Sequence, residues 1–159
     1  MSEKITKKQR SNNMRAIKSK DTSIELRVRK YLWHHGFRYR KNVKGLPGTP
    51  DIVIDKYRTV IFINGCFWHH HYNCKYATIP KSRQEYWIKK INKNVENDIK
   101  NTKLLIQDDY KVITVWECEI NHAFEDRMKY LIEEITDQDI DDIEAYNDEN
   151  IEEKETKTR

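Results

Sequence analysis

The sequence of 159 residues contains no apolar run of about the 20 residues that a membrane-spanning helix needs. It also has no charged start followed by an apolar core and a cleavage site. Its three cysteines are an odd number that does not suit a disulfide scaffold, and no internal repeat is visible. We therefore expect one soluble, intracellular domain rather than a membrane, disulfide-rich or repeat protein.

Charge is what the sequence has in excess, because 35% of its residues are charged and only 37% are hydrophobic. From residue 131 onward, 12 acids accompany 3 bases, whereas the preceding 130 residues carry a net charge of +13. A basic body gains affinity by displacing counterions from phosphates, which makes nucleic acid the first candidate partner and a membrane surface the second. We expect a basic arm at residues 1–20, one domain at 21–136 and an acidic, disordered tail at 137–159.

Hydrophobic periodicity predicts a mixed α/β domain. Apolar residues at helical spacing predict helices over residues 23–35, 83–107 and 122–135. Short apolar or alternating runs predict strands at residues 37–41, 52–54, 59–63 and 111–116. The second and third strands are separated by a short turn and should form an antiparallel hairpin. The third is almost entirely apolar, which is typical of a central strand buried on both faces.

Residues 62–74 read F-I-N-G-C-F-W-H-H-H-Y-N-C and concentrate metal ligands and aromatic side chains in one loop. Structural zinc takes four nitrogen or sulfur ligands, and Cys66, Cys74, Cys118 and one of the three consecutive histidines could supply them. Neighbouring histidines in a loop point in different directions. Another of the three is therefore free to act as a general base, and the spacing leaves open which one binds zinc.

Asp51 begins one strand of the predicted hairpin and Ile63 ends the other, so both should lie at the same end of the sheet. The Asp51 carboxylate and a backbone carbonyl near Ile63 are oxygen ligands of the kind that Mg²⁺ prefers. The adjacent Phe67 and Trp68 could stack on bases or wedge between them, or they could pack around the zinc.

Seven short blocks then lie in order between about residues 10 and 120. They are N-M-R-A-I at 13–17, D-T at 21–22 with Glu25, L-P-G at 46–48 with P-D at 50–51, Y-R at 57–58 with V-I-F at 60–62, G-C-F-W-H at 65–69, K-N-V at 93–95 with Asp98, and V-W-E-C at 115–118. Together they resemble the very short patch repair (Vsr) DNA mismatch endonucleases. The G-C-F-W-H string alone is nearly diagnostic of that family.

The resemblance implies a restriction-endonuclease-like α/β core, with a mixed central sheet flanked by helices and a structural zinc site. It implies an enzyme that nicks one DNA strand beside a T:G mismatch left by deamination of 5-methylcytosine, using Mg²⁺. Double-stranded DNA with that mismatch is then the partner, mismatch-repair proteins are further candidate partners, and a monomer in the bacterial cytoplasm, associated with the nucleoid, is expected.

The resemblance also implies roles for single residues. Asp51 and the backbone carbonyl of Ile63 bind Mg²⁺, and His69 is the general base. Glu25 and Asp98 are supporting acids that hold metal-bound water or orient the histidine, whereas spacing alone favours a helix-capping residue and a solvated surface acid.

The remaining implied roles are zinc binding and DNA binding. The zinc ligands are Cys66, His71, Cys74 and Cys118. The aromatic side chains that wedge into DNA are Phe67, Trp68 and Trp87, and two further DNA-binding residues are Arg15 and Asn64.

Two departures from the family pattern stand out. Asn64 occupies a position where the family usually has a histidine, and an amide neither titrates nor carries charge. Cys74 follows His71 by three residues rather than two, which lengthens the zinc loop by one residue.

Two alternative functions remain open at this point. One is a zinc-stabilised mismatch-DNA-binding module that has lost catalysis, and the other is a sequence-specific restriction endonuclease on the same core. A zinc nucleobase deaminase is excluded, because the H-x-E and P-C-x-x-C pairing that it needs is missing.

Overall fold

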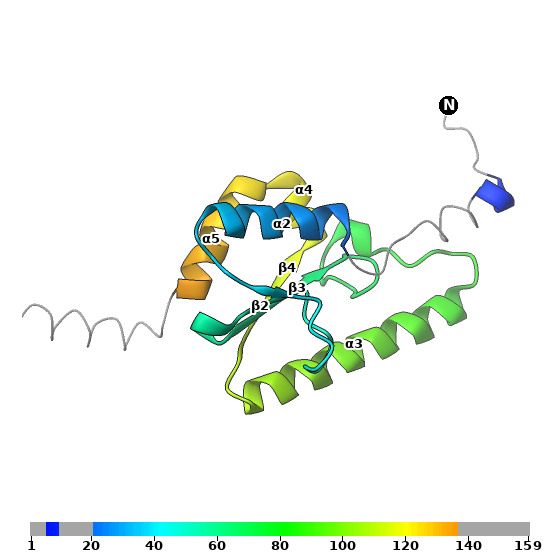
Figure 1. Cartoon of the computed structure of the whole chain (residues 1–159). Helices are drawn as coiled ribbons and strands as arrows, with labels where there is room; N and C mark the ends of the chain where they lie inside the picture. Colours follow the sequence, from blue (N-terminus) through cyan, green and yellow to red (C-terminus); the bar gives the residue numbers. More distant parts are fainter. Residues whose placement is uncertain (1–5, 10–20, 137–159) are drawn as a thin grey trace, which may run out of the picture.

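The computed structural model describes residues 6–9 and 21–136. Most of the expected basic arm, Arg15 included, and the whole expected acidic tail lie outside the described residues. Within them the order is α2 (Ser23–His34), β1 (Arg40–Lys41), β2 (Ile52–Ile54), β3 (Thr59–Asn64), α3 (Gln84–Gln107), β4 (Lys111–Trp116), α4 (Glu117–His122) and α5 (Phe124–Thr136) (Figure 1). Short 3₁₀ helices lie at Asp55–Tyr57 and Lys75–Ala77.

The four strands form one mixed sheet in the order β1-β2-β3-β4. β2 pairs antiparallel with both β1 and β3, and Ile52 lies opposite Ile61, so the predicted hairpin is confirmed. β3 and β4 run parallel, with Asn64 beside Trp116 at their ends. The loop that follows β3 and the helix that follows β4 therefore start at the same edge of the sheet.

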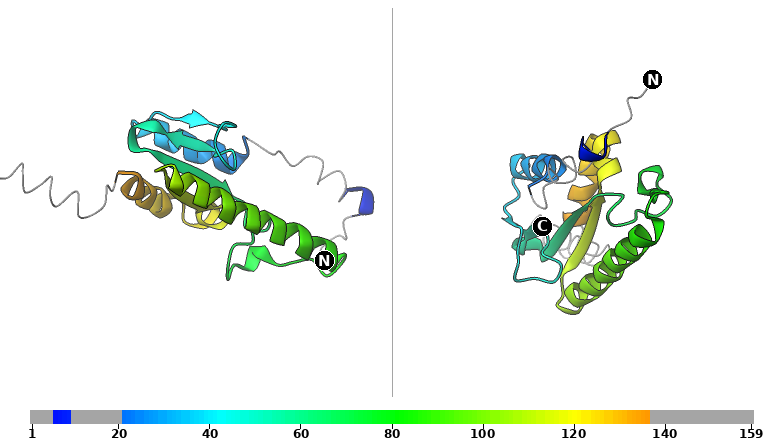
Figure 2. Two further views of the ribbon diagram at one scale, coloured as in Figure 1. Left: turned by 90° about the horizontal axis from the view of Figure 1, so that it is seen from below. Right: turned by 90° about the vertical axis from the view of Figure 1, so that its right-hand side faces the viewer.

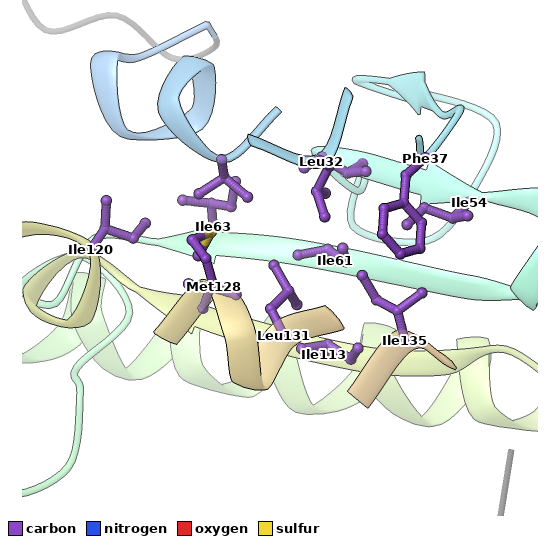
Figure 3. Close-up of a cluster of buried hydrophobic side chains, with 13 residues drawn as sticks. Leu32, Phe37, Ile54, Ile61, Ile63, Ile113, Ile120, Met128, Leu131 and Ile135 are labelled. Atoms are coloured by element: carbon purple, nitrogen blue, oxygen red, sulfur yellow. The ribbon is translucent and has the colours of Figure 1, made fainter. Parts of the chain in front are cut away.

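Helices cover both faces of the sheet (Figures 1 and 2). On one face, α2, α4 and α5 enclose the larger core, in which Leu32, Ile61 and Leu131 are fully buried (Figure 3). On the opposite face, Val60 packs in a smaller cluster with Leu105 of α3. Alternate residues of β3 thus face opposite cores, and the prediction of a central strand buried on both sides is confirmed.

Two predicted elements differ from the structure. The expected strand at 37–41 is reduced to Arg40–Lys41, because Phe37 turns into the larger core directly after Gly36, whose φ of 85° ends α2. The expected final helix at 122–135 corresponds to α5, but a short helix that was not predicted, α4, precedes it and ends at Ala123, where φ is −146°. α4 starts directly after β4, since the side chain of Glu119 accepts a hydrogen bond from the Trp116 backbone N–H at 3.4 Å.

Across residues 6–9 and 21–136, every helix is too short or too polar to span a bilayer.

Candidate active site and metal centre

A cleft of about 850 Å³ opens beside the end of β3. It is bounded by the start of α2, the loop before β2, the loop after β3 and the middle of α3. The titratable side chains that line it are Glu25, Lys44, Asp51, His69, Asp98 and Glu117. The structure therefore gathers the four residues expected to act in catalysis into one cleft, although they come from separate parts of the chain.

Asp51 lies between Pro50 and the first residue of β2, and its side chain turns toward the end of β3. Its Oδ2 accepts a hydrogen bond of 2.7 Å from the backbone N–H of Ile63. Burial raises the pKa of Asp51 to about 6, the charge of Glu25 adds to this rise, and the Ile63 hydrogen bond opposes it. A partly buried carboxylate of this kind gains most from a nearby cation, because a cation removes the electrostatic cost of ionisation.

His69 and Asp98 form a close pair across the cleft. Nδ1 of His69 lies 2.6 Å from Oδ2 of Asp98, which is on α3. The carboxylate accepts a hydrogen bond from Nδ1–H, so the lone pair on Nε2 of a neutral His69 faces away from Asp98. The backbone N–H of His69 donates to the Gly65 carbonyl at 3.2 Å, which holds the loop in place. This arrangement suits a general base that is oriented by an acid.

The second group of metal ligands is Cys66, His71, Cys74 and Cys118, whose ligand atoms all lie within 4.8 Å of one another. Nδ1 of His71 is 3.6 Å from Sγ of Cys66 and 3.4 Å from Sγ of Cys118. The His71 ring also stacks on Trp116 at 4.2 Å between centroids. Three thiols and one imidazole converging in this way could hold a metal ion, and they match the donor set that structural zinc prefers.

Backbone conformation explains how adjacent histidines reach different sites. His70 has a φ of 48° and is exposed, so the chain reverses between His69 at the cleft and His71 among the thiols. The extra residue in the loop is also accommodated, because Asn73 has a φ of 56°, a conformation that asparagine tolerates better than most residues. The structure thus brings His71 to the three cysteines, with the longer spacing to Cys74.

Three aromatic rings gather beside the cleft. Phe67, Trp68 and Trp87 meet edge to face at centroid distances of 5.1 to 5.8 Å, and Tyr86 packs on Trp87 at 5.1 Å. The rings are half-buried against one another, and Trp68 lines the cleft. Phe67 and Trp68 thus pack on Trp87, and both expectations for them, contact with DNA bases and packing around the zinc, stay predictions.

Asn64 ends β3 and lines the cleft, although it is only 8% exposed. Arg29 was not predicted to lie near this site, yet its guanidinium contacts Glu25 and the backbone of Asp51. The four-residue step from Glu25 to Arg29 on a predicted helix could have indicated the first of these contacts. The contact with the Asp51 backbone depends on the tertiary fold, and no sequence pattern indicates it.

Carboxylates suited to a divalent cation, a histidine paired with an acid and a separate Cys/His cluster form an arrangement of the kind found in metal-assisted hydrolases. Comparison with known proteins gives the family. A sequence model of the family described as DNA mismatch endonuclease Vsr matches residues 2–75.

Several curated relatives match most of the chain. It is 50% identical over 139 residues to the type II nicking enzyme V.NmeAIP of Neisseria meningitidis serogroup A, covering 86% of this chain and 99% of the relative. It is 44% identical over 129 residues to the DNA mismatch endonuclease Vsr of Escherichia coli K12, covering 81% and 80%. It is 38% identical over 135 residues to the type II nicking enzyme V.XorIIP of Xanthomonas oryzae pv. oryzae, covering 84% and 98%. The chain belongs to the Vsr family of DNA mismatch endonucleases, and is thus a DNA endonuclease, a hydrolase.

Proposed function

We propose that this protein nicks one strand of double-stranded DNA next to a T:G mismatch, in very short patch repair, by Mg²⁺-dependent hydrolysis on a restriction-endonuclease-like core. The observation that carries the proposal is the placement of Asp51 and the His69–Asp98 pair in one cleft beside three clustered aromatic rings. The names of the relatives support it, since they include both a mismatch endonuclease and nicking enzymes.

In this proposal the carboxylate of Asp51 and the backbone carbonyl of Ile63 hold Mg²⁺, for which oxygen ligands are suited. When bound, Mg²⁺ supplies positive charge that polarises the scissile phosphate and stabilises the leaving oxygen. Glu25, which lines the same cleft, orients the attacking water by accepting a hydrogen bond from it.

His69 takes the proton of that water at Nε2 as the water oxygen bonds to phosphorus and the bond to the leaving oxygen breaks. The imidazolium that forms is stabilised by the Asp98 carboxylate, 2.6 Å from Nδ1. Asp98 therefore acts through His69, while His69 acts on the reacting atoms.

Zinc at Cys66, His71, Cys74 and Cys118 serves as scaffolding in the proposal. These ligands join the loop after β3 to the start of α4, and the stacking of His71 on Trp116 fixes the loop against the end of β4. The same short loop carries His69 and two of the aromatic rings, so a metal there would hold the catalytic base and the DNA wedge in place.

DNA binding is assigned to the aromatic cluster, whose members are Phe67, Trp68 and Trp87, and to Arg15 and Asn64. A mismatched step is weakly stacked, which lowers the cost of inserting a ring at that point. The exposed lysines of α3, which are Lys89, Lys90, Lys93 and Lys100, add contacts to phosphates that do not depend on sequence.

A nicking assay tests the proposal. The purified protein should nick a duplex that holds a T:G mismatch only when Mg²⁺ is present, and Asp51→Ala should abolish nicking while the zinc content stays intact. Equal activity of Asp51→Ala would contradict the catalytic assignment.

A panel of other mismatches and a fully paired duplex is the control. Mismatch binding without Mg²⁺-dependent cleavage would favour the non-catalytic module that Asn64 suggests. Cutting of both strands of a fully paired duplex would favour a restriction endonuclease.

A further inference from the structure

Arg29 is a buried cation that connects three parts of the chain behind the cleft. It lies on α2, is 3% exposed and is not among the residues that line the cleft. Its Nη1 donates to Oδ1 of Asp21 at 2.7 Å, while Nη2 donates to Oδ1 of Asn42 at 3.0 Å and to the Asp51 carbonyl at 3.2 Å. One guanidinium on α2 thus joins Asp21, just before that helix, to Asn42, just after β1, and to the backbone of Asp51, just before β2.

The same Nη2 atom also contacts Oε2 of Glu25 at 3.4 Å. Glu25 is 5% exposed, so its carboxylate is held between the cleft on one side and the guanidinium on the other. A buried carboxylate keeps its charge and its position only when a partner compensates it. Within the described residues, Arg29 is the cation that contacts Glu25.

We propose that Arg29 is a positioning residue, which holds the Glu25 carboxylate and the backbone of Asp51 at a fixed separation so that both acids face the cleft. The inference rests on the roles proposed above for Glu25 and Asp51. Arg29 itself touches neither the DNA nor the reacting atoms. It acts through the two acids, in the way that residues behind metal ligands orient them in other proteins.

The planar fork of arginine is essential to this role. Its two terminal nitrogens reach acceptors in different directions, and a lysine ammonium, which is a single point, could not reach Asp21 and the Asp51 carbonyl together. Arg29→Lys therefore keeps the buried charge but cannot bond to Asp21 and the Asp51 carbonyl at once, which separates the effect of geometry from that of charge.

The first test measures metal binding without any reaction. The zinc-loaded, DNA-free protein is titrated with Mn²⁺, and bound Mn²⁺ is followed by electron paramagnetic resonance. We expect Arg29→Met to weaken Mn²⁺ binding about tenfold, and Arg29→Lys to weaken it by a smaller but measurable factor. Arg27→Met is the matched control, because Arg27 lies on the same helix with its guanidinium over the Phe124 ring at 4.4 Å. Unchanged or tighter Mn²⁺ binding by both Arg29 variants would overturn the proposal.

The second test is a double-mutant cycle in single-turnover nicking at saturating DNA. We expect Arg29→Met to lower the rate about 30-fold with little change in DNA affinity. Adding it to Glu25→Gln should cost clearly less than the product of the two single losses, because Arg29 acts partly through Glu25. If Arg29 only stabilises the fold, the rate loss of the double variant should equal the product of the two single losses, and the loss caused by Arg29→Met should match its unfolded fraction. That result would also overturn the proposal.

Arg29→Lys retains the charge that the buried acids need, so it keeps the test decisive if Arg29→Met does not fold. The two tests also separate this inference from the proposed function. If the wild-type protein fails to nick any mismatched duplex, the proposed function fails, while Mn²⁺ binding still decides the role of Arg29.

Discussion

The Cys/His cluster and the carboxylate cleft lie at the same edge of the sheet, yet they are assembled differently. Three of the four cluster ligands fall within residues 66–74, and Cys118 joins them because β4 runs parallel to β3. The cleft takes its acids from α2, from the start of β2 and from α3, and its histidine from the loop after β3. The cluster is therefore mostly local in sequence, whereas the cleft exists only once the whole domain has folded.

The two regions also differ in how their ligands are satisfied. In the cluster, four donor atoms face one another and leave no position for a substrate, which is typical of a structural metal site. In the cleft, Asp51 and Glu25 line an open space, and ionisation of Asp51 is unfavourable mainly because its carboxylate is buried, with the charge of Glu25 adding to this effect. We therefore expect substitutions in the Cys/His cluster to lower stability, and substitutions in the cleft to lower activity without unfolding the protein.

The largest effect is expected from breaking the cluster. Cys118→Ala should lose bound metal and lower the free energy of unfolding by at least about 3 kcal/mol, because metal binding is part of the folding free energy of such sites. Thermal unfolding and metal analysis measure this, and activity should fall with the folded fraction. Tyr72→Ala is the control in the same loop, because Tyr72 is 88% exposed and should change neither quantity. A Cys118→Ala protein as stable as the wild type would show that the cluster is not structural.

A large effect on activity alone is expected from the cleft. Asp98→Asn should lower the nicking rate about 100-fold or more, because an amide no longer fixes the proton on Nδ1 of His69 or stabilises its charged form. Its melting temperature should stay within a few degrees of the wild type, since the pair is partly exposed.

The matched control for Asp98→Asn is Glu96→Gln. Glu96 is an exposed acid on the same helix, and its loss should leave the nicking rate unchanged. If the two variants lose activity equally, the effect reflects the net charge of α3 rather than the orientation of His69.

Sequence alone predicted what depends on local pattern. The helices at α2 and α3 and the β2–β3 hairpin follow from hydrophobic periodicity, and the hairpin brings Asp51 to the same end of the sheet as Ile63. The convergence of Cys118 with Cys66 follows from the parallel pairing of β4 with β3, which spacing could suggest but not establish.

What the sequence could not predict depends on long-range geometry. Arg29 could have faced solvent, as most arginines on helices do, until the fold brought Asn42 and the Asp51 carbonyl to its guanidinium. The short helix α4 was also not predicted, because six residues are too few for a helical periodicity to be recognised in the sequence. The roles proposed for Glu25 and Asp98 rest on the family resemblance, because helix position alone indicated a capping or surface acid.

The smallest effect should appear in the pH dependence of the free energy of unfolding, to which Asp51 in the cleft contributes. The pKa of Asp51 is raised from 3.8 to about 6, so between these values the folded state binds more protons than the unfolded state. The contribution of Asp51 to the free energy of unfolding is therefore highest below pH 3.8, where the carboxyl is protonated in both states. It falls as the pH rises through 6, because the buried carboxyl must then ionise in the folded state. Asp51→Asn removes this titration, while the amide oxygen can still accept a hydrogen bond from the Ile63 N–H. In Mg²⁺-free buffer, the variant should therefore be roughly 2 to 3 kcal/mol more stable than the wild type at pH 8.

Urea unfolding of the wild type and Asp51→Asn across this pH range measures the difference. The two proteins should differ least near pH 4 and most above pH 7, and added Mg²⁺ should narrow the gap at pH 8 by stabilising only the wild type. The variant should be inactive although it is more stable, which would separate activity from stability in the cleft. A constant difference at all pH values would mean that folding does not raise the pKa of Asp51.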